Sequence, residues 1–251
     1  MLKFDDPDYL ALLFHLNSSV WGNAAAYTEQ VHEASYREPS PGATPLPASG
    51  RSEIDRLVAE RRSCREFADA PLAAATLAAI LRAGYGITGT RQPPDPWTGY
   101  GRSVPSAGAL YPLDVYAAVE RIDGIAGGVY RFNPLGDALE PVASPATVAS
   151  IRSHLLQPES CERANALVIL TAEFEKTMSK YGPRGYRYIL LEAGHVAQNV
   201  CLAAVGFGLQ TLCLGGFSDV HINADLGLDG RSKAALYCLA VGHPGGRGQR
   251  E

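Results

Sequence analysis

The longest predicted helix, roughly residues 184–205, most constrains the fold because it is apolar on nearly all sides. A helix of this kind has to be buried. In a chain of 251 residues it can lie at the centre of the core or at an interface between two copies, and we expect it to do both. Its apolar residues are Ile189, Leu190, Ala193, Val196, Ala197, Val200, Leu202 and Ala204.

Short apolar runs on both sides of this helix predict strands, because their lengths suit strands and their residues favour burial. Helical spacing of apolar residues predicts further helices, one of which runs directly into Arg61. Residues 91–101 are predicted to be loop. Together these elements indicate an α+β fold with a largely antiparallel sheet flanked by helices. The predicted strands cover 115–119, 127–132, 166–170, 210–216 and 234–241, and the predicted helices 9–16, 54–61, 77–84 and 184–205.

A proline-rich segment divides the chain. Residues 39–47 read PSPGATPLP, which cannot form a helix and indicates an extended linker. We therefore predict an N-terminal extension over residues 1–50 and a main domain over residues 51–251.

Composition narrows the classes of function. An apolar fraction of 46% supports a substantial core, and a formal charge of −4 argues against nucleic acid as the main partner. The first residues lack a secretory signal and no run suggests a membrane span, so we expect a cytoplasmic protein without a membrane partner. The five cysteines form no C-x-x-C pair, which disfavours a zinc site and a disulfide framework. Cys201, Cys213 and Cys238 lie in apolar runs, where we expect them to act as small hydrophobic residues.

Two clusters of residues suggest ligand-binding sites. Residues 61–67 read RRSCREF, and two or three guanidinium groups with a serine hydroxyl can bind a dianionic phosphate. Taken alone, the same run is also typical of a solvated helix end. Residues 105–112 read PSAGALYP, whose small residues would let the backbone approach a flat ring. Taken alone, this run is also ordinary turn chemistry.

The ordered set of motifs resembles the nitroreductase superfamily of flavin enzymes, and within it the SagB-type azoline dehydrogenases. The resemblance spans about residues 51–244 and rests on RRSCR, PSAGALYP, the run KYGPRGYRY at 180–188, the segment LEAGHVAQN at 191–199 and LGGF at 214–217. It implies the nitroreductase-like fold, FMN as cofactor, and a homodimer whose flavin sites are built from both chains. The implied FMN-binding residues are Arg61, Arg62, Ser63, Arg65, Ser106, Gly108, Gly215 and Gly216. Arg247 is a weaker candidate for the phosphate.

One position departs from the pattern. Ordinary nitroreductases carry an asparagine in the loop that contacts the flavin pyrimidine edge, whereas Ala109 stands at the equivalent place here. This departure fits the SagB-like branch.

The pair Lys180 and Tyr181 resembles the lysine and tyrosine assigned to azoline oxidation. Aromatising a thiazoline or oxazoline removes a proton from one ring carbon and a hydride equivalent from its neighbour, so a base has to stand opposite the flavin. A lysine can be that base only when neutral, and burial favours the neutral form. Outside this resemblance, the pair would be read as part of a solvated loop.

The resemblance therefore implies an FMN-dependent dehydrogenase that acts on azoline rings of peptide or carrier-bound intermediates. It also implies that the protein associates with other subunits of a biosynthetic complex. An NAD(P)H-dependent nitroreductase or flavin reductase is the alternative. A further alternative is a non-catalytic, flavin-binding subunit of such a complex. Glu192 and His195 are helix-spaced, but without matching ligands elsewhere we predict no metal site and expect Glu192, His195, Gln198 and Asn199 to form hydrogen bonds between helices or subunits.

Overall fold

The computed structural model describes residues 7–18, 39–48, 50, 52–90 and 99–246. For residues 7–10 and 17 it describes the backbone only. Its centre is a six-stranded sheet with the strand order β7-β6-β4-β8-β10-β9, in which each neighbouring pair is antiparallel. The strands are β4 (Leu113–Val119), β6 (Gly128–Asn133), β7 (Ala138–Ala143), β8 (Ala166–Glu173), β9 (Gln210–Leu214) and β10 (Lys233–Gly242).

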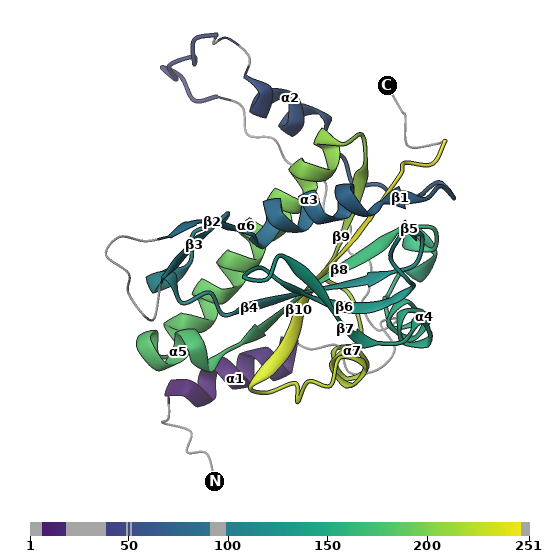
Figure 1. Ribbon diagram of the computed structural model, residues 1–251. Coiled ribbons are helices and arrows are strands. Elements are labelled where there is room, and N and C mark those ends of the chain that lie inside the picture. Colours follow the sequence, from purple (N-terminus) through teal and green to yellow (C-terminus); the bar gives the residue numbers. More distant parts are fainter. Residues whose placement is uncertain (1–6, 19–38, 49, 51, 91–98, 247–251) are drawn as a thin grey trace.

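Helices cover both faces of this sheet (Figure 1). Strand β8 shows why: Val168 and Leu170 belong to one buried cluster, whereas Leu167 and Ile169 belong to the other. A strand whose alternate side chains enter two cores needs cover on both sides. One core packs α3 (Ala74–Tyr85) and α6 (Arg184–Gly206); the other packs α4 (Pro145–Ser153) and α7 (Asp219–Asp225).

The helix predicted over about 184–205 is present as α6 and packs against the sheet. Ile189, Val196 and Val200 are fully buried, but Leu190 and Leu191 are 39% and 56% exposed. Among the described residues, α6 alone is long and apolar enough to cross a membrane by length and composition, and half of that window is buried inside the molecule. Packing against the sheet accounts for this buried half, and the exposed half carries charged and polar residues beside Leu190 and Leu191.

Smaller elements frame this core. A short parallel pair joins β1 (Leu72–Ala73) to β5 (Ile122–Asp123), and an antiparallel hairpin joins β2 (Ile87–Thr90) to β3 (Tyr100–Arg102). The predicted loop over 91–101 was therefore wrong at its end, where Tyr100 and Gly101 lie in β3 and pair with Thr90 and Gly89; the rest of it, 91–98, lies outside the described residues.

The proline-rich segment 39–48 is exposed and contains no helix or strand. The helix α1 (Pro7–Ser18) lies on the opposite side of the molecule from α2 (Glu53–Glu60) (Figure 1). It buries Ala11 and His15, whereas Leu13 is 36% exposed. The division of the chain at residue 50 stays a prediction.

Candidate functional site

The arginine cluster lies where α2 ends and the chain joins the edge of the sheet. Arg61 is the C-terminal cap of α2, as the sequence predicted, and its N–H donates to the Leu57 carbonyl. Beyond it, Ser63 bridges Thr211 in parallel, and the Cys64 N–H donates to the Thr211 carbonyl at 2.9 Å. The segment thus extends the sheet beside β9, which buries Cys64 and leaves Ser63 and Arg65 exposed.

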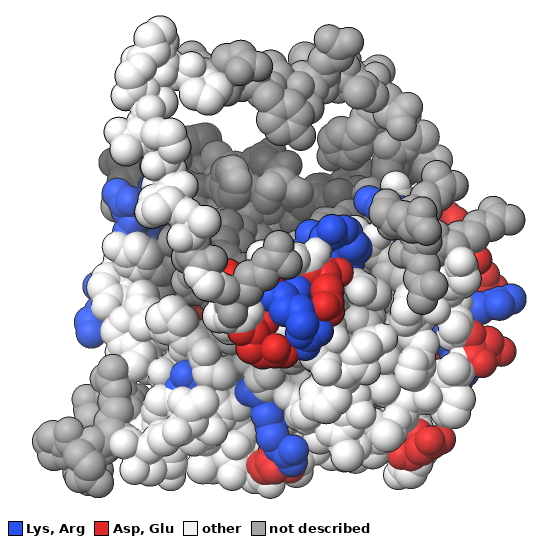
Figure 2. Space-filling view, turned by 90° about the horizontal axis from the view of Figure 1, so that it is seen from above, with Lys and Arg blue, Asp and Glu red and all other residues white. Residues whose placement is uncertain are grey.

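The Arg56 side chain of α2 pairs with carboxylates of the same helix, whereas the Arg62 guanidinium of the cluster donates to the backbone carbonyls of Ala59 and Arg61. Arg56 pairs with Glu53 at 2.5 Å and with Glu60 at 2.7 Å. Seen from above, where α2 lies, basic and acidic side chains accordingly gather side by side (Figure 2). In the part of the chain that the structure describes, no ion pair with a carboxylate forms at Arg61, Arg62 or Arg65. Three guanidinium groups without carboxylate partners suit a dianionic phosphate.

Residues 106–111 form a tight loop in an unusual backbone conformation. Gly108, Ala109 and Tyr111 have φ values of 62°, 54° and 47°, in the left-handed region. This region costs an L-residue about 1–2 kcal/mol, so only Gly108 adopts it freely. Such strain persists where surrounding contacts enforce it and is common at functional sites.

Two hydrogen bonds and a stacked arginine hold this loop. The Ser106 hydroxyl accepts from the Tyr111 N–H at 3.0 Å, and the Tyr111 hydroxyl accepts from the Arg102 N–H at 3.1 Å. The Arg102 guanidinium lies 4.2 Å from the ring centre of Tyr85 and 5.0 Å from that of Tyr111. A surface hollow of about 260 Å³ adjoins the loop, and Arg102, Leu110 and Tyr111 contribute to its lining.

Beneath the loop lies a buried carboxyl group. Glu192 of α6 is 3% exposed and accepts a 2.7 Å hydrogen bond from the Tyr85 hydroxyl, whose oxygen in turn accepts from the Leu113 N–H. Burial raises the pKa of Glu192, while hydrogen bonds from Ser106 and Tyr85 oppose that shift. Burial also raises the pKa of Tyr85. The expected bond between helices at Glu192 is present, and it ties α6 to α3 and to the loop.

Lys180 and Tyr181 meet the same loop from α5 (Glu175–Tyr181). A Cβ atom added at Gly108 would lie 2.8 Å from the Tyr181 hydroxyl and 3.0 Å from Lys180 Nζ. The lysine Nζ also lies 5.5 Å from the centre of the Tyr181 ring. The structure therefore brings together three residues that the sequence named separately, and it places the pair at the end of a helix rather than in a loop.

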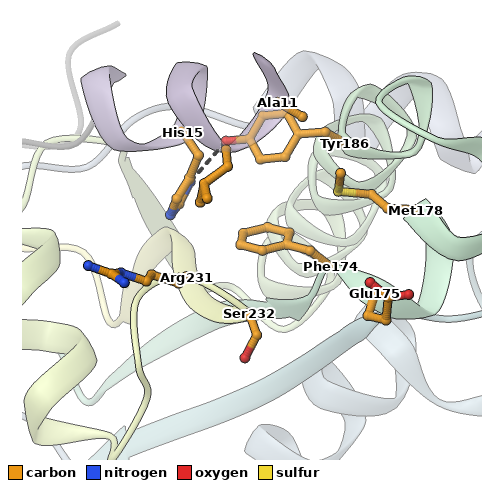
Figure 3. A pocket seen from close by; sticks show the side chains of 9 residues that line it. Ala11, His15, Phe174, Glu175, Met178, Tyr186, Arg231 and Ser232 are labelled. Atoms are coloured by element: carbon orange, nitrogen blue, oxygen red, sulfur yellow. Dashed lines mark hydrogen bonds between the residues drawn. The ribbon is translucent and has the colours of Figure 1, made fainter. Parts of the chain in front are cut away.

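Lys180 is exposed, so the burial that the base hypothesis requires is not supplied by this chain alone. Helix α5 is itself held from another side by α1. His15 and Tyr186 form a 3.0 Å hydrogen bond over Phe174 and Met178, beside a cavity of about 140 Å³ (Figure 3). Burial lowers the pKa of His15. The N-terminal helix thus packs against the elements that carry the lysine and tyrosine.

The glycine pair follows the edge strand β9. A Cβ atom at Gly215 would meet nothing within 4 Å, whereas at Gly216 it would lie 2.8 Å from the Leu156 side chain. The backbone at Gly215 is therefore open to an approaching group, and Gly216 is required for packing. Arg247, the weaker phosphate candidate, lies outside the described residues.

Within one chain, two groups of the predicted site residues lie apart from each other. The arginine cluster lies beside Gln210 and Thr211, which pair with the Gly242 end of β10, and Leu57 approaches Gly206 at the end of α6. The 106–111 loop and the lysine–tyrosine pair lie at the other end, where Leu113 pairs with Ala172 and α6 begins. The loop lies over Glu192 and the cluster lies near Gly206, 14 residues further along α6, a rise of about 21 Å, so one chain does not bring the two groups together.

Cys201 and Cys238 are buried as predicted, but Cys213, on the last strand of the sheet order, is exposed. Asn199 donates to the carbonyls of Ala83 and Ser103, whereas His195 and Gln198 are exposed. Among the described residues no group of three His, Cys, Asp or Glu side chains could hold a metal.

Known proteins share this sequence and fold. The protein MJ1384 of Methanocaldococcus jannaschii, named a nitroreductase, is 36% identical over 177 residues, which cover 70% of this chain and 85% of that protein. The microcin B17-processing protein McbC of Escherichia coli is 37% identical over 150 residues, 57% of this chain and 54% of McbC. The chain thus spans about half the length of McbC.

Solved structures of nitroreductases and of a microcin synthetase complex share the fold of this chain. A chain of the E. coli microcin synthetase McbBCD complex, with truncated pro-MccB17 bound, superposes with a TM-score of 0.74 at 26% identity, covering 96% of this chain and 95% of that one. A nitroreductase from Desulfovibrio desulfuricans in complex with FMN shares the fold alone, with a TM-score of 0.55 at 17% identity over 80% of this chain and 92% of that one. The profile of the Nitroreductase family matches residues 58–243, more than half of the chain. The resemblance inferred from the motifs is confirmed: the chain belongs to the nitroreductase family.

Proposed function

We propose that this protein is an FMN-dependent dehydrogenase that oxidises thiazoline or oxazoline rings to azoles in a peptide or carrier-bound intermediate. The observation that carries the proposal is the contact of Lys180 and Tyr181 with the strained loop at Gly108. A proton acceptor and a hydroxyl group meet there beside small residues that a flat ring could approach. The likeness to McbC, a protein that processes microcin B17, supports a peptide-derived substrate.

The residues present fit FMN. The guanidinium groups of Arg61, Arg62 and Arg65 and the Ser63 hydroxyl would hold its phosphate, because they are donors without carboxylate partners in the described structure. The open backbone at Gly215 would face its ring, and Ser106 and Gly108 would lie along the ring. When bound, FMN supplies the acceptor for the hydride equivalent that the azoline loses.

The chain's own residues handle the proton. Lys180 Nζ, when neutral, takes the proton from the azoline ring carbon, so that the ring loses one hydrogen as a proton and one as hydride. The Tyr181 hydroxyl, which also lies against Gly108, orients the ring or the lysine. Because Lys180 is exposed in the single chain, the substrate, the flavin and a second protomer have to supply its desolvation.

A homodimer follows from the separation of the two groups. The phosphate-binding cluster and the lysine–tyrosine pair occupy opposite ends of α6, so a complete site requires the pair from one protomer and the cluster from its partner. Two separate apolar pairs are exposed for contact with a partner, Leu190 and Leu191 on α6, and Ile54 and Val58 on α2 at 60% and 51% exposure. We also propose a cytoplasmic location and association with further subunits, the latter on the likeness to a chain of the McbBCD complex.

The test is a pair of substitutions at the proposed base, Lys180→Ala and Tyr181→Phe, assayed with a thiazoline-containing peptide. We expect Lys180→Ala to abolish azole formation and to keep bound FMN, and Tyr181→Phe to lower the rate. Lys233→Ala is the matched control, since this exposed lysine pairs with Glu173 at the same end of the sheet. A Lys180→Ala protein that turns over like the control would overturn the assignment.

A further inference from the structure

Two cysteines from different elements meet beside the arginine cluster. Cys201 of α6 and Cys213 of β9 have their sulfur atoms 3.7 Å apart. Cys201 is 2% exposed and Cys213 is exposed, so one thiol is sheltered and the other faces solvent in the described chain. Cys64, Cys161 and Cys238 are all buried. The pair therefore differs from the remaining thiols in both geometry and access.

Polar neighbours shift the pKa values of the two thiols in opposite directions. The Thr211 hydroxyl donates to Cys201 Sγ at 3.1 Å. A hydrogen bond from the Cys201 thiol lowers the pKa of Cys213, and the Tyr237 hydroxyl and the charge of Arg61 act in the same direction. The same bond and burial raise the pKa of Cys201. The Cys213 thiol is therefore the more readily ionised of the two.

This is the arrangement of a peroxide-reactive thiol with a second thiol in reach, because the thiolate is the nucleophile and access decides which thiol reacts. The described residues around it provide no third ligand for a metal. A disulfide bond is about 2.05 Å long, so the sulfurs have to approach by roughly 1.7 Å. Cys213 lies on β9, the last strand in the sheet order, whose outer side is met by the Ser63–Cys64 segment at Thr211.

We infer that Cys201 and Cys213 form a reversible dithiol–disulfide site that is oxidised by hydrogen peroxide. The Cys213 thiolate attacks one peroxide oxygen, the O–O bond breaks, and hydroxide leaves, which gives a sulfenic acid at Cys213. The Cys201 sulfur then attacks Cys213 Sγ, the S–O bond breaks, and water leaves with the proton of the thiol. The two thiols lose two electrons in total and the peroxide gains them.

Formation of the bond would link α6 covalently to β9. That strand contacts the Ser63–Cys64 segment at one end and leads into Gly215 at the other. The site goes beyond the proposed function and does not depend on it, since peroxide and a dithiol suffice.

The experiment treats the purified full-length protein with hydrogen peroxide, blocks free thiols with N-ethylmaleimide, and maps the chymotryptic peptides by mass spectrometry. Cleavage after Phe207 separates the two cysteines, so a disulfide appears as two joined peptides. We expect this joined species in the oxidised protein, loss of maleimide labelling at both cysteines, and recovery of both labels after dithiothreitol. Full labelling of both cysteines after peroxide would overturn the inference, as would Cys213 joined to a different cysteine.

Substitutions distinguish the thiol that reacts with peroxide, Cys213, from the thiol that then closes the disulfide, Cys201. With Cys201→Ser we expect Cys213 to stop at the sulfenic acid, which dimedone traps, and with Cys213→Ser we expect Cys201 to stay fully labelled. Cys161→Ser, which removes a buried thiol elsewhere, is expected to give the wild-type disulfide. Should a variant fail to fold, the wild-type mapping still decides the inference.

Discussion

Replacing Gly108 with alanine separates the cost of a strained backbone from the displacement of the proposed catalytic pair. The left-handed φ of 62° costs an alanine about 1–2 kcal/mol, partly offset by about 0.4–1 kcal/mol from a less flexible unfolded chain. The net loss of about 1 kcal/mol lowers the melting temperature by about 2–4 °C in a domain of this size. Stability therefore changes little.

The new Cβ atom has a larger effect on the site. It would lie 2.8 Å from the Tyr181 hydroxyl and 3.0 Å from Lys180 Nζ, whereas ordinary contact begins at 3.4 Å. These are the ends of flexible side chains, so they yield and move by about 0.6 and 0.4 Å. Misplacing reacting groups by about 1 Å can cost about 100-fold in rate, and we expect a loss of about ten- to a hundred-fold in kcat.

The assay measures azole formation from a thiazoline peptide alongside thermal unfolding. Gly124→Ala is the matched control, because Gly124 has a φ of 77° and its added Cβ would meet nothing within 4 Å. Both variants are expected to lose similar stability, and Gly108→Ala alone is expected to lose turnover. Equal turnover in the two variants would refute the placement of Lys180 and Tyr181 at the reaction centre.

Three further predictions address the cofactor, the buried carboxyl group and the dimer. Arg65→Ala is expected to weaken FMN binding by about 10- to 150-fold, because one charged hydrogen bond of about 1.5–3 kcal/mol is lost. Fluorescence titration measures the affinity, and Arg56→Ala is the control because its guanidinium is already paired on α2. Equal affinities of the two variants would contradict the phosphate site. Because the folded pKa of Glu192 is raised above its ordinary 4.5, the native state holds the extra proton and the wild type loses stability as pH rises from 4.5 through the raised value. Glu192→Gln is expected to lack this slope in denaturant melts across that range, and an unchanged slope would show that another group causes it. Leu191→Glu, on the exposed face of α6, is expected to yield monomers by light scattering and to lose FMN, while a dimer of wild-type stability would rule out this face as the interface.

Much of the fold was predictable because buried helices and strands have apolar residues at regular spacings or in continuous runs along the sequence. The run from Ala166 to Leu170 and the all-round apolar helix α6 are strong patterns, and both were located within a few residues. The hairpin strand Tyr100–Arg102 was missed because three residues carry no periodicity. Cys213 was taken for a core thiol because strand alternation does not tell an edge strand from a central one.

The candidate site was predictable only in its parts. Motif order named Lys180, Tyr181 and Gly108, yet only the folded chain shows that they touch. The contact arises between α5 and a loop whose left-handed residues no pattern indicates, since Ala109 and Tyr111 adopt that conformation against their own preference. The Cys201–Cys213 pair escaped notice for the same reason: twelve residues of separation give no motif, and a helix packed on a strand creates it.

The central claim is tested most directly by an anaerobic titration of the FMN-loaded protein, following the visible flavin absorbance. One cell receives a thiazoline-containing peptide and the other NADPH or NADH. The account predicts rapid bleaching by the peptide and none by the nicotinamide. Bleaching by nicotinamide alone would contradict it and identify a reductase.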